Sequence, residues 1–109
     1  MTTRVRVMSE TRRPFKPDLY VVARMIEKLL QSKDGMLKRT QLQMRAGLNW
    51  NVFSKYLELM LSRQLVSIVT KGDGEYVALT QRGMKVYRSL IDSIGSILGE
   101  YWMDVGKRR

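Results

Sequence analysis

The side chains that could do chemistry in this chain are mostly basic. The sequence contains no histidine and no cysteine, which removes the commonest acid–base group, the commonest metal ligand and every thiolate site. It also lacks a glycine-rich phosphate loop and a pair of carboxylates on a shared helical face. We therefore predict that the protein is not an enzyme and needs no cofactor, metal or small-molecule ligand.

The remaining chemistry is recognition of a polyanion. Twenty Lys and Arg side chains stand against ten Asp and Glu among 109 residues, a formal net charge of +10. Basic and acidic side chains number five and one in residues 1–17, ten and six in 18–83, and five and three in 84–109. This excess favours a nucleic acid as partner, although a basic composition can also serve solubility alone.

Apolar residues at helical spacing predict three helices that would position these charges. Asp18 is a good N-cap for the first helix, which Asp34-Gly35 should end. Its expected apolar positions are Leu19, Val22, Ile26, Leu29 and Leu30. An extended link over residues 36–39 leads to Thr40, the expected cap of a brief helix over 41–46 that Gly47 stops.

The third predicted helix begins after Asn49, its expected N-cap, and carries one apolar stripe: Val52, Phe53, Tyr56, Leu57, Met60 and Leu61. Two helices joined by a tight glycine-containing turn form a helix-turn-helix unit. Two β-rich segments, 65–69 and 75–79, flank a Lys71-Gly72-Asp73-Gly74 turn. We therefore expect a β-hairpin directly after the third helix.

Thr80 is expected to cap a long final helix with a heptad pattern. Its core positions are Met84, Tyr87, Ile91, Ile94, Leu98, Tyr101 and Val105. The stripe is longer than a domain of this size can cover, so we predict a homodimer through this helix; the alternative is that the stripe folds back on the domain. Tyr87 and Tyr101 share a heptad position and would face their own copies in a parallel pair, which favours an antiparallel one.

The chain resembles small archaeal winged helix-turn-helix DNA-binding proteins with a C-terminal antiparallel coiled-coil dimerisation helix. The resemblance covers about residues 18–105 and rests on several short segments: Thr40-Gln41-Leu42, Ala46-Gly47-Leu48-Asn49, Phe53, Tyr56-Leu57-Glu58, Leu65-Val66 and the run from Tyr76 to Gly83. It implies a mostly α fold with a small β-hairpin wing, in a dimer that binds double-stranded DNA. A transcriptional regulator and a nucleoid-associated architectural protein both fit, and the cytoplasm is the expected location.

In such a domain the third helix enters the major groove, so its exposed residues become candidate DNA contacts. These are Asn49, Trp50, Asn51, Ser54 and Lys55. Asn49 has a competing role as cap, and Trp50 either closes the core or packs against sugar or a thymine methyl. Further candidates, mainly for phosphate, are Lys38, Arg39, Gln41, Gln43, Arg45 and, on the wing, Lys71.

The sequence thus predicts a flexible basic arm (1–17), a winged helix-turn-helix domain (18–83), and a coiled-coil helix with a basic tail (84–109). No stretch is apolar enough to span a membrane and no secretory signal is expected. The alternative function is a winged-helix module that binds other proteins in a transcription or other assembly, because fold alone does not fix function. Such a module would not need the basic excess in residues 1–17 and 38–55.

Overall fold

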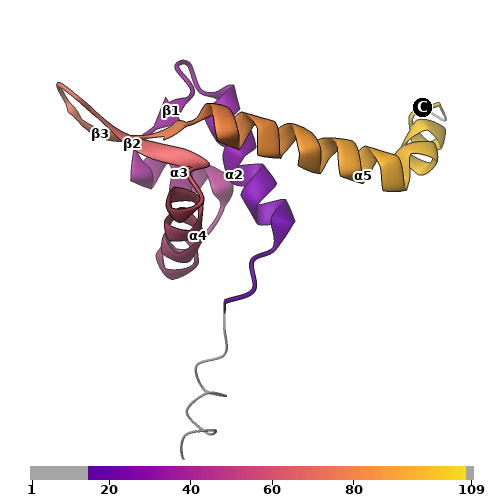
Figure 1. The fold of residues 1–109 in the computed structure, drawn as a ribbon, viewed down its shortest axis with the longest axis horizontal. Coiled ribbons are helices and arrows are strands. Elements are labelled where there is room, and N and C mark those ends of the chain that lie inside the picture. The colour runs from indigo at the N-terminus through magenta and orange to yellow at the C-terminus, as the bar shows by residue number, and fades with distance from the viewer. Residues whose placement is uncertain (1–14, 108–109) are drawn as a thin grey trace, which may run out of the picture.

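The computed structural model describes the backbone of residues 15–107 and the side chains of residues 15–95. Its elements, in chain order, are α2 (Leu19–Gln31), β1 (Met36–Leu37), α3 (Arg39–Ala46), α4 (Trp50–Ser62), β2 (Val66–Lys71), β3 (Gly74–Leu79) and α5 (Gln81–Lys107). The strands form one antiparallel sheet in the order β1-β3-β2. The β2–β3 hairpin and α5 extend in opposite directions from the helical body (Figure 1). The predicted fold class, mostly helical with a small β wing, is confirmed.

Three of the predicted helix caps are present. The Asp18 side chain accepts a hydrogen bond from Tyr20 N at 2.8 Å, and the Asn49 side chain accepts one from Val52 N at 2.9 Å. The Thr80 hydroxyl accepts one from the backbone N–H of Gly83 at 2.9 Å. Each cap satisfies a donor that the first helical turn leaves free, which is why these short polar residues mark helix starts.

Two predicted helix boundaries are wrong. α2 ends at Gln31 rather than at Asp34-Gly35, because Ser32 is extended and its hydroxyl donates to Leu29 O at 2.6 Å. α3 begins at Arg39, so Thr40 is not its cap. The Gln41 side-chain oxygen accepts a hydrogen bond from Lys38 N at 3.0 Å, which satisfies a free backbone donor ahead of the expected start.

The core lies between α2, α3, α4 and the inner face of the sheet. Its fully buried large side chains are Phe53, Met25, Ile26, Leu29, Leu42, Met60 and Val77. Met25 was not among the predicted apolar positions, whereas Leu19 and Leu30 were, yet these two are 57% and 36% exposed. The α2 stripe is centred between Met25 and Ile26, so Leu19 and Leu30 lie at its edge.

α3 and α4 end in the same backbone motif. Leu48 N donates to Gln43 O at 3.2 Å, and Leu65 N donates to Met60 O at 2.8 Å. The residue before each leucine adopts a left-handed conformation, with φ of 71° at Gly47 and 62° at Gln64. Glycine takes this conformation freely, whereas a residue with a side chain costs about 1 kcal/mol or more there. The motif fixes the direction in which α4 and β2 begin.

The start of α5 is tied to the end of α4. Thr80 N donates to Leu65 O at 3.1 Å, and the Thr80 hydroxyl lies 2.7 Å from Gln64 O and 2.9 Å from Leu65 O. Gly83 is buried against the same backbone: a Cβ there would overlap the carbonyl oxygen of Leu65 and lie 2.7 Å from Leu79 Cδ1. Only glycine lets α5 approach this closely.

We expect Gly83→Ala to lower the free energy of unfolding by about 2 kcal/mol or more, because the backbone at Leu65 cannot yield as a flexible side chain can. Gly95→Ala is the matched control, since it lies in the same helix and, apart from its chain neighbours and the nearby backbone of that helix, no described atom lies within 4 Å of the place that its new methyl group would take. That change should stabilise the protein by about 0.5–1 kcal/mol through helix propensity. Urea unfolding followed by circular dichroism measures both, and equal effects would contradict the close approach.

Candidate nucleic-acid interface

The turn between α3 and α4 is held by side chains as well as by backbone. Gln43 Nε2 donates to Leu48 O at 2.6 Å, across the turn. From α2, the Arg24 guanidinium donates to Ala46 O at 3.0 Å, satisfying one of the last carbonyls of α3. Gln43, a predicted DNA contact, therefore has a structural hydrogen bond within the protein. Its effect is to fix where α4 begins.

The outer face of α4 is open to solvent. Asn51 and Lys55 are exposed and stand one turn apart, so both project from the same side of the helix. Asn49 has its side-chain oxygen engaged in the cap. Trp50 is partly packed and partly exposed: its ring lies 5.3 Å from that of Phe53, and it remains 48% exposed.

Beside this outer face lies a shallow hollow shared by α3 and α4. Its lining residues are Arg39, Trp50, Ser54, Leu57, Glu58 and Leu61. Arg39 also pairs with Glu75 of β3, with 3.6 Å between its guanidinium and the carboxylate. Arg39 therefore stands where α3, α4 and the wing meet, and its positive charge faces the same side as Ser54.

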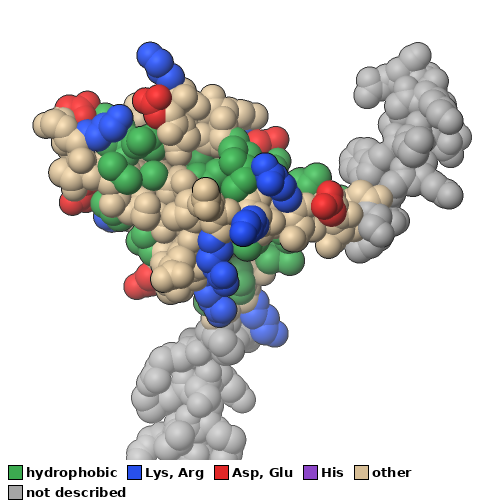
Figure 2. All heavy atoms as spheres, turned by 45° about the horizontal axis from the view of Figure 1, so that its top comes forward, with side chains coloured by type: hydrophobic (Ala, Val, Ile, Leu, Met, Phe, Trp, Pro, Cys, Tyr) green, Lys and Arg blue, Asp and Glu red, His purple; other side chains and the backbone are tan. Residues whose placement is uncertain are grey.

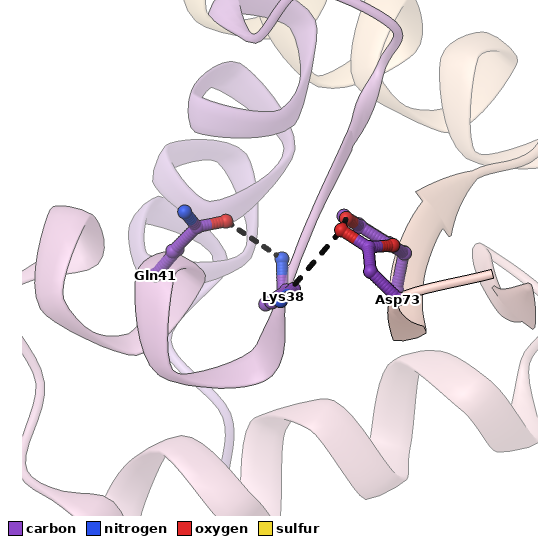
Figure 3. A network of polar contacts seen from close by, with 4 residues as sticks. Lys38, Gln41 and Asp73 are labelled. Atoms are coloured by element: carbon purple, nitrogen blue, oxygen red, sulfur yellow. Dashed lines mark hydrogen bonds and ion pairs between the residues drawn. The ribbon is translucent and has the colours of Figure 1, made fainter. Parts of the chain in front are cut away.

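A second cluster forms on the outer face of the sheet. Tyr76 of β3 lies between two lysines, with Lys38 Nζ 5.7 Å and Lys71 Nζ 5.9 Å from its ring centroid. Its hydroxyl donates to Asp73 at 2.7 Å. Lys38 pairs with Asp73 at 3.9 Å (Figure 3). Lys71 pairs with Asp34, also at 3.9 Å. These ion pairs thus connect the wing to the residues on either side of β1.

The candidate DNA contacts predicted from the sequence did not include Tyr76, Glu75 or the two carboxylates of this cluster, Asp73 and Asp34. The signal that could have found them is strand alternation, which sets successive β3 residues on opposite faces. Val77 faces the core and pairs with Ile68, so Tyr76 points outward beside Val69 while Glu75 points toward α3. The register of the hairpin was needed to make that assignment.

Apart from Trp50 and Ser54, which line the hollow described above, the predicted DNA contacts separate into two groups according to whether they have partners within the protein. Within residues 15–95, Lys38, Arg39 and Lys71 have carboxylate partners, and Gln41, Gln43 and Asn49 accept or donate backbone hydrogen bonds. Arg45, Asn51 and Lys55 have neither in that range. No charged side chain is buried there. Figure 2 shows basic side chains near the centre of one face, among hydrophobic ones, with most acidic side chains nearer its edge.

The first part of the predicted dimerisation surface on α5 packs against the core of its own domain. Val86 and Tyr87 of α5 pack against the core, and Met84 is half-buried. Ile91, one turn further on, is 43% exposed. Ile91 and Ile94 line a hollow between α5 and α2 together with Tyr20, Ala23, Arg24, Glu27 and Tyr87. The side chains of Leu98, Tyr101 and Val105 lie outside the described residues.

The Tyr76 hydroxyl lowers the pKa of Asp73, chiefly by its hydrogen bond and with help from the charges of Lys38 and Lys71. The same hydrogen bond raises the pKa of Tyr76. Because the pKa of Asp73 is lowered by folding, its contribution to stability is complete above the ordinary value and declines as pH falls through the lowered one.

Tyr76→Phe should move the pKa of Asp73 up toward its ordinary value of 3.8, since the largest cause of the shift is removed. A pH titration followed by NMR of the side-chain carboxyl carbon measures this. Tyr20→Phe, which removes an exposed hydroxyl far along the chain on α2, should leave it unchanged. An unchanged Asp73 titration in the Tyr76 variant would mean that the backbone hydrogen bond of Asp73 and the charges of Lys38 and Lys71 set the shift.

In the part of the chain that the structure describes, no helix is long and apolar enough to cross a membrane. A protein-family model described as "Winged helix-turn-helix" matches residues 21–95. No curated protein sequence matches the chain significantly.

Solved structures share this fold at low sequence identity. AbsC, a MarR family transcriptional regulator from Streptomyces coelicolor, superposes with a TM-score of 0.65 at 15% identity over 77% of this chain and 59% of that one. This chain therefore spans less than two thirds of that regulator. Sso10a-2, a DNA-binding protein from Sulfolobus solfataricus, gives 0.54 at 23% identity, covering 79% and 88%. Sco3205, a MarR family regulator from Streptomyces coelicolor solved in complex with DNA, gives 0.60 at 19% identity, covering 81% and 62%.

Proposed function

Because this chain belongs to the winged helix-turn-helix family, we propose that it is a dimeric double-stranded DNA-binding protein that reads the major groove with α4. The observation that carries the proposal is the outer face of α4. Asn51 and Lys55 are exposed there, without intramolecular partners among the described residues, on a helix whose first turn is fixed by Asn49 and Gln43. A rigid helix with free polar groups at its N-terminal half suits groove entry.

Base contacts follow from the chemistry of that face. The Asn51 amide can pair with the N6 and N7 atoms of adenine, and the Lys55 ammonium can reach guanine O6 or N7, or a phosphate. The exposed part of Trp50 offers an apolar surface for a sugar or a thymine methyl. Ser54 is half-buried on the side toward Arg39, so it is better placed for a contact at the groove edge.

We assign the phosphate contacts to the basic side chains that surround α4. Arg45 is exposed on α3, and Lys38, Arg39 and Lys71 stand at the wing side. The carboxylate partners of the last three are themselves exposed, and such pairs contribute only about 0–1 kcal/mol each. Phosphate can therefore displace them at little cost. Gln41 keeps its amide N–H₂ for a phosphate, since its oxygen serves the start of α3.

The known proteins with this fold support the proposal, since Sso10a-2 is described as DNA-binding and Sco3205 was solved with DNA. The role is that of a transcriptional regulator or a nucleoid-associated protein, both in the cytoplasm. Selection of bound sequences from a random duplex pool separates the two: a defined motif indicates a regulator, and its absence an architectural protein. Failure to recover any duplex would favour the protein-binding module.

We expect a steep salt dependence of duplex affinity, because each phosphate neutralised on B-form DNA adds about 0.9 to the slope of log affinity against log salt. Lys55→Ala should lower affinity and reduce this slope by about 0.9 if Lys55 neutralises one phosphate. Lys85→Ala removes the same charge from α5, away from the α4 face, and should change the slope less. Fluorescence anisotropy over a salt series measures all three proteins.

A nearly flat salt titration for the unaltered chain would contradict the DNA-binding proposal. Equal reductions in affinity from Lys55→Ala and Lys85→Ala would leave DNA binding intact but remove α4 as the reading element. Circular dichroism of each variant establishes that the fold is retained, which both substitutions should allow because neither lysine is buried.

The dimer is proposed through α5. Its 27 residues span about 40 Å, whereas the side chains that pack on the core belong to its first two turns. Beyond them, Ile91 is 43% exposed, and the neighbouring α2 presents Leu19 and Tyr20 at 57% and 61% exposure. An apolar strip that continues past its own domain is the kind of surface that a second copy covers.

Ile91→Glu should shift the protein from dimer to monomer, because a charge would be buried in the interface. Ser93→Glu adds the same charge on the opposite side of α5 and should leave the dimer intact. Light scattering over a concentration series gives the mass of each. A dimer that survives both Ile91→Glu and truncation after Arg88 would rule out α5 as the interface.

A further inference from the structure

Every ion pair within residues 15–95 joins the β2–β3 wing to the segment around β1. The charged atoms are 3.6 to 3.9 Å apart, and the side chains involved are between 43% and 66% exposed. The pairs are Lys38–Asp73, Arg39–Glu75 and Lys71–Asp34. Their three cations are the ones that we assign to phosphate on the wing side. Carboxylates of the protein therefore occupy the groups that DNA would use.

One of these carboxylates is held in place by a second contact. The Tyr76 hydroxyl donates to Asp73 at 2.7 Å, and the Tyr76 ring lies between Lys38 and Lys71. The hydrogen bond from Tyr76, with the charges of the two lysines, lowers the pKa of Asp73. The Asp73 side chain thus stays charged and stays directed toward Lys38 (Figure 3). This pair is built by the hairpin and is more than an encounter of two flexible side chains.

The cations nearer α4 lack such partners. Arg45 on α3 and Lys55 on α4 are exposed and have no carboxylate partner among the described residues. The amide of Asn51, one turn before Lys55, is likewise exposed. The groups that would read bases are therefore free before DNA arrives, whereas the groups on the wing side are already paired.

We propose that Asp34, Asp73 and Glu75 compete with DNA phosphate for the wing-side cations and so lower the affinity for DNA that α4 does not read. The inference rests on the proposed function, because it takes DNA as the partner of the wing. A phosphate that binds one of these cations first has to displace its carboxylate. Phosphate contacts are the sequence-independent part of binding. Weakening them makes stable binding depend more on the base contacts of α4.

The competition follows from the fate of the displaced carboxylate. Opening an exposed ion pair costs little in itself, but the carboxylate remains attached to the protein beside the phosphate. At such short range its repulsion is only partly screened, because the Debye length is about 8 Å at physiological salt. The freed carboxylate also attracts a cation from solution, which offsets the counterion that the neutralised phosphate releases. The pairs should therefore reduce both the affinity and its salt dependence.

Glu75→Gln tests this by freeing Arg39 with little change in side-chain size. Affinity of the full chain for a duplex of random sequence is measured by fluorescence anisotropy over a salt series. We expect the variant to bind about two- to fivefold more tightly at low salt. The slope of log affinity against log salt should steepen by up to about 0.9. Asp73→Asn should act in the same direction through Lys38.

Asp92→Asn is the matched control for charge. Asp92 is an exposed residue of α5 with no ion pair among the described residues, so its removal changes the net charge equally without freeing a wing-side cation. Affinity and slope should change less than in Glu75→Gln. Circular dichroism establishes that each variant folds, which we expect because Glu75, Asp73 and Asp92 are all exposed.

A double-mutant cycle separates competition for a cation from simple repulsion of DNA. If Glu75 acts through Arg39, the gain from Glu75→Gln should disappear in a protein that also carries Arg39→Ala, because no cation is left to be freed. An equal gain with and without Arg39 would mean that Glu75 only repels DNA, and it would overturn the inference.

The remaining outcomes are also distinct. A gain that depends on Arg39 and exceeds that of Asp92→Asn supports the inference. Affinity that Glu75→Gln leaves unchanged or lowers, or that Asp92→Asn raises equally, overturns the inference while DNA binding itself stands. No duplex binding at low salt by either the unaltered chain or Glu75→Gln overturns the inference and the proposed function together.

Discussion

The contact between Thr80 and the backbone at Leu65 sets the relation between the wing, the helical body and α5. One side chain accepts from Gly83 N and approaches the carbonyls of Gln64 and Leu65, so the end of α4 and the start of α5 share a hydrogen-bonded point. Gly83 makes the approach possible because it has no Cβ to meet the Leu65 carbonyl. The hairpin leaves this point in one direction and α5 in the other (Figure 1). The two surfaces that we propose for function, one on α4 and the wing and one on α5, are therefore separate.

The first of these surfaces depends on how firmly α4 is held. Asn49 closes its first turn, Gln43 braces the turn before it, and Tyr56 receives both Phe15 and the backbone of Asp18. These contacts use the polar side chains that lie around α4 and leave those on its outer face unpaired within the described residues. Because α4 is already held in place by contacts within the protein, it would not have to rearrange in order to enter a DNA groove. Less of the binding free energy is then spent on ordering side chains and backbone.

The basic side chains on the wing side of the domain are paired with carboxylates, whereas the lysine on the outer face of α4 has no such partner among residues 15–95. On the wing side, Lys38, Arg39 and Lys71 each have a carboxylate within 3.9 Å, and Tyr76 lies between two of the lysines. On α4 itself, Lys55 has no such neighbour in the described part of the chain. The wing pairs hold the hairpin against the β1–α3 junction while they remain exposed and weak enough for a phosphate to replace the carboxylate.

The sequence by itself determined the order of the elements, three helix caps, the glycine stop of α3 and most of the core. These features depend on neighbours in the chain, because a cap or an apolar stripe acts over a few residues. Local hydrogen bonds that the sequence pattern did not reveal end α2 at Gln31, make Lys38 rather than Thr40 the N-cap of α3, and let Gln43 brace the turn before α4. Tertiary structure decided which side chains meet across the fold. It decided the partners of Arg39, Lys71 and Tyr76 and the anchoring of Phe15, because these contacts join residues whose proximity is set by strand register and helix packing, and no local pattern encodes either.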